Sequence, residues 1–97
     1  MSNLPPTRNE NHLKLSAVEF KALPWHEKFI ASRTILAYTV RSDNRMIEQE
    51  TLADMLGCSM KTVNNVENEL TAPSNMIRHM FNAFVSGKCI RILEAIK

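Results

Sequence analysis

Residues 49–67 constrain the fold most strongly, because they read as two short helices joined by a tight turn. Apolar residues repeat with helical spacing on both sides of a glycine: Leu52, Ala53 and Leu56 precede it, and Val63 and Val66 follow it. Gly57 suits the end of the first helix, since glycine adopts the left-handed conformation without a Cβ clash. Ser59 stands where the second helix needs an N-cap. The sequence therefore predicts a helix pair over about 49–68.

The composition favours an all-helical fold around this pair. The chain has 97 residues, enough for one small domain, with two glycines and four prolines that stand at segment ends. We expect an all-α small helical bundle of about five helices. No apolar run approaches the roughly 18–20 residues of a membrane span, and no signal peptide is evident. We therefore expect a cytoplasmic protein with no membrane contact.

The N-terminal half divides into a tail and two helices. Residues 1–12 are polar and contain Pro5-Pro6, which predicts a flexible tail and a single domain over 13–97. Arg8 would alternatively make this tail an arm that enters a DNA groove. A capping box at Ser16-Ala17-Val18-Glu19 predicts a helix over 17–22. Pro24 opens a longer helix over 24–41, with an apolar stripe formed by Trp25, Phe29, Leu36 and Val40.

The C-terminal half restarts after Thr71-Ala72-Pro73-Ser74, a break that predicts a new helix. Gly87 is predicted to close that helix, whose apolar face comprises Met76, Ile77, Met80, Phe81 and Phe84. Residues 88–97 then form a final helix or a strand. Their apolar content predicts either a lid on the core or a dimer contact.

The sequence contains no motif that is typical of an enzyme active site. The three histidines (12, 26 and 79) are scattered, and neither a local Ser/His/Asp signature nor a Gly-rich phosphate loop is present. Cys58 and Cys89 are far apart and lack metal-ligand spacing, so we expect buried thiols. The sequence thus predicts no catalytic residue, no metal site and no cofactor, and it shows no evident small-molecule site.

The exposed face of the second helix carries unusual polar content: Met60, Lys61, Asn64, Asn65 and Asn68. Asparagine is a mediocre helix former, so three asparagines on one exposed face suggest that their side chains hydrogen-bond to a partner. Asparagine pairs with adenine, lysine donates to guanine, and a methionine packs on a thymine methyl. A merely solvated face is the alternative. The net charge of +2 counts against DNA binding, because phosphate contacts would depend on the local placement of few cations.

A family resemblance rests on several spaced residues: Leu52-Ala53, Gly57, Ser59, Thr62-Val63, Val66-Glu67 and Pro73. This spacing resembles the helix-turn-helix of phage Cro proteins, phage repressors and their bacterial and plasmid relatives, over about residues 36–85. The chain departs from the pattern at Glu48, where the family has a Ser or Thr cap, and at Glu69, where it commonly has glycine. The 23-residue N-terminal extension lies outside the pattern.

The resemblance implies a sequence-specific transcriptional regulator that binds double-stranded DNA as a homodimer on a palindromic operator, and we expect it to be a repressor. The base-contacting residues in the major groove would be Met60, Lys61, Asn64 and Asn65. The phosphate-contacting residues would be Gln49, Asn68, Thr71, Ser74, Asn75 and Arg78. Gln49 would alternatively brace the second helix.

Two other interpretations stay open at this point. A protein-interaction module, such as an antitoxin or adaptor, would use residues 88–97 or the N-terminal extension to bind a partner chain. The near-neutral charge favours it. A winged helix would fit residues 49–70, but residues 71–97 lack the paired strands that make a wing.

Overall fold

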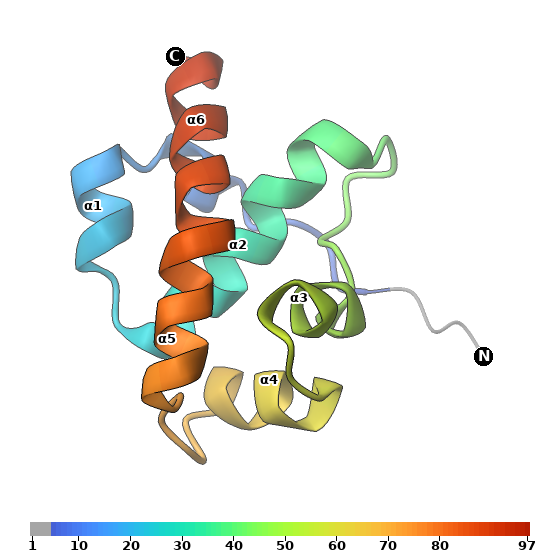
Figure 1. The fold of residues 1–97 in the computed structure, drawn as a ribbon. Helices are drawn as coiled ribbons and strands as arrows, with labels where there is room; N and C mark the ends of the chain where they lie inside the picture. Colours follow the sequence, from blue (N-terminus) through green and yellow to red (C-terminus); the bar gives the residue numbers. More distant parts are fainter. Residues whose placement is uncertain (1–4) are drawn as a thin grey trace.

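The structure, a computed structural model, describes residues 5–97, and its helices and turns form one bundle (Figure 1). The elements in chain order are the 3₁₀ helix η1 (Glu10–Lys14), α1 (Ala17–Ala22), α2 (Trp25–Val40), α3 (Gln49–Leu56), α4 (Met60–Glu67), α5 (Asn75–Phe81), the π-helical η2 (Asn82–Ser86) and α6 (Gly87–Ile96). Apart from one isolated bridge between Thr7 and Arg45, the described residues form no β structure. The predicted all-α bundle is confirmed.

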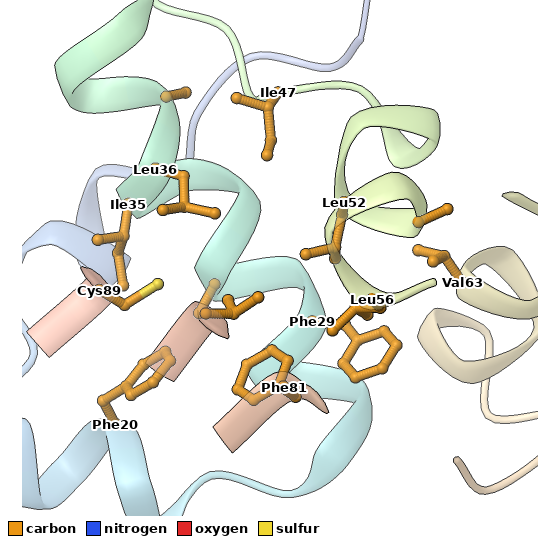
Figure 2. Close-up of a cluster of buried hydrophobic side chains, with 14 of the residues drawn as sticks. Phe20, Phe29, Ile35, Leu36, Ile47, Leu52, Leu56, Val63, Phe81 and Cys89 are labelled. Carbon is orange, nitrogen blue, oxygen red and sulfur yellow. The ribbon is translucent and has the colours of Figure 1, made fainter. Parts of the chain in front are cut away.

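Helix α2 is the centre of the bundle. Its residues 31–37 are all buried, because α4 packs on one side of it and α6 on another. The ring of Phe81 stacks on that of Phe29 at 5.5 Å between centroids and meets the edge of Trp25 at the same distance. Leu52, Leu56 and Val63 extend this core into the helix pair (Figure 2). The helix pair therefore shares one hydrophobic core with the rest of the chain.

Local signals place the helix starts correctly. Ser16 and Glu19 form the predicted capping box, with the Ser16 hydroxyl accepting from the Glu19 N–H and the Glu19 carboxylate accepting from the Ser16 N–H. Ser74 likewise caps α5, since its hydroxyl accepts from the Ile77 N–H at 3.2 Å. The bounds of α1 and the break before α5 match the prediction.

The predicted helix end at Gly87 is wrong. Gly87 has right-handed helical geometry with φ −62°, and α5, η2 and α6 run as one continuous rod over residues 75–96 (Figure 1). Cys89 and Leu93 are fully buried beyond it. Their burial outweighs the roughly 1 kcal/mol that a helical glycine costs. Residues 88–97 therefore form a helix that covers the core, as the lid interpretation expected.

Two predicted core positions on the rod and one on α2 are also wrong. On the rod, a different row of side chains faces the core. Met76 is 74% exposed and Phe84 is 53% exposed, whereas the core side is formed by Ile77, Phe81, Val85, Cys89 and Leu93. These five are four residues apart, and the wider turn of η2 keeps them on one side of the rod. Val40, the last residue of α2, is 70% exposed.

The predicted flexible tail is wrong for residues 5–12, and residues 1–4 lie outside the described part of the chain. Arg8 donates from Nη2 to the backbone carbonyls of Ala37 at 2.7 Å and Arg41 at 2.9 Å. Its Nε donates to the carbonyl of Arg45. Arg8 thereby satisfies carbonyl groups at the end of α2, a helix with no basic residue in its last turn. Arg8 therefore caps the end of α2 from a distant part of the chain, and it does not extend as a groove-entering arm.

Candidate nucleic-acid interface

The turn between α3 and α4 has the geometry that the sequence predicts. Gly57 has φ +71° and ends α3 in the left-handed conformation. The Ser59 hydroxyl accepts from the Thr62 N–H at 3.2 Å, and α4 begins at the next residue, Met60. Glu48, the poor cap noted in the sequence, makes no side-chain capping bond to α3. Turn and cap thus fix the register of α4 relative to α3.

The inner faces of the two helices are closed against the core. Leu52, Ala53 and Leu56 of α3 are buried, and so are Val63 and Val66 of α4. Ala53 is the small residue that allows α4 to cross close to α3. The outer face of α4 stays exposed.

A buried polar contact locks the far end of α4. Glu67 Oε1 accepts from Arg33 Nη1 at 2.8 Å and from Gln49 Nε2 at 3.0 Å. The side chains of Arg33 and Glu67 are only 5% and 7% exposed. Arg33 Nε also donates to the Ile47 carbonyl at 2.9 Å. One carboxylate therefore ties together the middle of α2, the start of α3 and the end of α4.

The sequence analysis did not predict a role for Arg33, and it identified Glu67 only as one residue of the family pattern. An arginine inside the apolar stretch of α2 was the available signal, because a buried guanidinium needs an acceptor. Gln49 was expected either to touch a phosphate or to brace the second helix. Its amide occupies the bracing position.

The four predicted base-contacting residues come together on the outer face of α4. Met60, Lys61 and Asn64 are exposed, and Asn65 is half-buried. Their i, i+1, i+4, i+5 spacing places them on one side of the helix. The Asn64 side-chain oxygen accepts from Asn68 Nδ2 at 2.5 Å, which leaves the Asn64 amide hydrogens outward.

The predicted phosphate-contacting residues differ in exposure and in the contacts they already make. Thr71, Ser74 and Asn75 are exposed in and after the loop that follows α4, and Asn68 caps the end of α4. Arg78 is half-buried, and its guanidinium carbon lies 5.7 Å from the centre of the Trp25 ring. Lys28 approaches the same ring at 4.7 Å. Lys61 is the single basic residue of α4, so the cationic charge at this face is low.

No family model, curated protein or solved structure matches the chain. The resemblance to phage repressors therefore stays a prediction that rests on residue spacing. Within residues 5–97, no three metal-ligating side chains come together. None of the helices in that range has both the length and the apolar character needed to cross a lipid bilayer.

Proposed function

We propose that this protein is a sequence-specific regulator of transcription that places α4 in the major groove of double-stranded DNA. The observation that carries the proposal is the contrast between the two sides of α4. Its inner side is fixed by Val63, Val66 and the Glu67 contact, and its outer side holds adjacent outward polar side chains. A helix held rigidly by one side and polar on the other is suited to reading base edges.

The side chains on this face match the hydrogen-bonding pattern of the major groove. Asn64 and Asn65 offer amide groups that pair with adenine, Lys61 donates to guanine, and Met60 packs on a thymine methyl. Each good base contact contributes about 1–3 kcal/mol of discrimination. Thr71 and Asn75 would contact the flanking phosphates, together with the backbone at the start of α5.

A second copy of the chain completes the proposal. Helix α4 has eight residues and is therefore about 12 Å long, which spans only a few base pairs. Two copies on a palindromic operator double the readout, as helix-turn-helix dimers do. Such a regulator, of phage, plasmid or bacterial origin, would work as a repressor in the cytoplasm, at the nucleoid.

A protein-interaction module is the second candidate, and one observation favours it. Met76 and Phe84 are large apolar side chains exposed on the C-terminal rod, where DNA reading has no use for them. An antitoxin or adaptor on the same scaffold would bury them against a partner chain. In that case DNA binding would be secondary or absent.

Selection of bound duplexes from a random DNA pool tests the proposed function directly. We expect an enriched symmetric site whose binding weakens between about 50 and 200 mM salt, by an amount set by the number of phosphates that each copy neutralises. No enrichment at low salt would overturn the proposal and leave the interaction module as the better interpretation.

Asn65→Ala then tests the assignment of α4 to base contacts. The Asn65 side chain makes no hydrogen bond within residues 5–97, and alanine favours a helix, so the variant is expected to fold. We expect a loss of about 5- to 150-fold in affinity for the selected site and little change on unrelated DNA. Asn82→Ala, an exposed asparagine on η2, is the matched control and should bind normally. Equal losses on both DNAs would refute the base-contact role.

A further inference from the structure

A groove of about 480 Å³ opens between the C-terminal part of α2, the helix α3 and the helix α6. Its floor is apolar and comprises Leu36, Ile47, Met55 and Ile92. A volume of this size lies within the range of small-molecule sites in proteins.

The apolar surface of this groove is incompletely covered by the chain itself. Val40 forms one wall and is 70% exposed, although it is one of the most apolar residues of α2. Met55 and Ile92 are half-buried and pack against the core with one side only. An apolar ligand would remove this surface from water, which is favourable.

The wall formed by α6 is cationic. Lys88 and Arg91 both line the groove and are exposed, and neither forms an ion pair with any residue from 5 to 97. Glu94, the one acidic residue of α6, does not line the groove. Two cations beside an apolar floor complement a molecule with an apolar chain and an anionic head.

We propose that this groove binds a small amphipathic carboxylate. Its alkyl chain would lie over Ile47, Met55 and Ile92, and its carboxylate would meet Lys88 and Arg91. The Thr51 hydroxyl lines the same groove and would help to orient the head group, whereas the Thr39 hydroxyl donates to the Leu36 carbonyl. The proposal does not depend on DNA binding, because all of these residues lie outside the outer face of α4.

A second copy of this chain fits the groove less well. A two-fold interface centred on it would bring Lys88 and Arg91 of both copies close together, with no carboxylate among the lining residues to compensate them. Like charges brought together in this way oppose association. A small anion neutralises both cations without that penalty.

Calorimetric titration of the DNA-free protein with octanoate tests the proposal, with octanol and octyltrimethylammonium as probes of the same chain length. We expect octanoate to bind more tightly than both. Lengthening hexanoate to octanoate should tighten binding by up to about fourfold per methylene. Amide chemical shifts should move at Val40, Met55 and Ile92. Equal binding of octanoate and octanol, or shifts confined to other residues, would overturn the assignment.

Charge-matched variants locate the anionic head. The double variant Lys88→Gln/Arg91→Gln should weaken octanoate binding by about tenfold, as expected for two partly exposed charge contacts. The double variant Lys14→Gln/Lys21→Gln removes two exposed charges from η1 and α1 and should bind octanoate normally. Val40→Asp should also weaken binding by placing a carboxylate at the wall.

Each remaining outcome counts against the groove as a ligand site. Equal weakening in both double variants would indicate nonspecific attraction. Concentration-dependent dimerisation that excludes octanoate from wild-type protein would assign the groove to a second copy. Because octanoate binding is measured without DNA, failure of the proposed function would leave this result unchanged, and the converse also holds.

Discussion

The helix pair (α3 and α4) and the N-terminal segment (residues 5–14) are both held against α2, but by different interactions. The helix pair buries five aliphatic or small side chains, and its turn is set by Gly57 and Ser59. The N-terminal segment buries mainly Leu13 and His12, and its first half is held by the hydrogen bonds of Arg8. The first region depends mainly on packing. The second depends mainly on hydrogen bonds: those of Arg8, the Arg45 Nη1 bond to the Pro5 carbonyl and two backbone bonds.

The two regions should therefore lose their structure in different ways. The Arg33–Glu67 contact joins the helix pair to α2, so losing one of its partners is expected to destabilise the pair as a whole. The N-terminal segment has few apolar packing contacts, so it should detach locally while the bundle stays folded. The variants below separate these two kinds of failure.

Replacing Glu67 by alanine is expected to have the largest effect. The variant leaves the Arg33 guanidinium buried without its carboxylate and removes the acceptor of Gln49. Breaking one side of a buried ion pair typically lowers the free energy of unfolding by about 3–5 kcal/mol. Chemical denaturation at neutral pH measures the loss.

Two further variants show whether charge or packing is responsible. Glu94→Ala removes an exposed glutamate from α6 and should change stability by less than about 0.5 kcal/mol. The double variant Arg33→Met/Glu67→Met should recover much of the loss, because apolar pairs often replace buried ion pairs without cost. A loss of under about 1 kcal/mol in Glu67→Ala would mean that this contact is no stronger than a surface pair.

Replacing Arg8 by alanine should have a smaller and more local effect. We expect a loss of about 2 kcal/mol, since a charged donor is removed from carbonyl groups that water can then reach. Hydrogen exchange should accelerate in residues 5–14 and in the last turn of α2. The helix pair should keep its protection.

A lysine at position 8 sharpens this test. Arg8→Lys keeps the charge but lacks the planar fork that reaches the Ala37 and Arg41 carbonyls together, so it should restore only part of the stability. Lys14→Ala, on the same segment, should have little effect. Faster exchange throughout α3 and α4 in Arg8→Ala would show that the two regions are not independent.

The sequence predicted what depends on neighbouring residues. Helix starts at Ser16, Ser59 and Ser74 are fixed by hydrogen bonds that span three residues, and each was placed correctly. Gly57 and Gly87 show the limit of such reasoning. Both stand where a helix could end, but only Gly57 has positive φ, because beyond Gly87 the burial of Cys89 and Leu93 continues the helix.

Contacts between distant residues escaped prediction. Arg8 reaches carbonyls 29 and 33 residues away, and Arg33 meets Glu67 across 34 residues. A polar segment with two prolines looks flexible when no partner for its arginine is visible. On α4, spacing alone indicated which side chains share the outer face, because one helix contains them all. Whether these side chains read DNA stays a prediction.

Acid should produce the smallest effect, and it should act through the N-terminal segment. Burial lowers the pKa of His12, although Glu27, 3.7 Å away, acts in the opposite direction. The folded protein then binds fewer protons at this position than the unfolded chain does. Stability is therefore retained above pH 6.5 and lost progressively as the pH falls toward the lowered pKa of His12.

Unfolding measured between pH 7.5 and 5.5 checks this dependence while most carboxylates stay ionised. His12→Asn removes the titrating group and should flatten the dependence, even though the variant is less stable at pH 7.5. His79→Asn, an exposed histidine on α5, should keep the wild-type slope. If His12→Asn and wild type lose the same free energy on acidification, the pH sensitivity arises elsewhere.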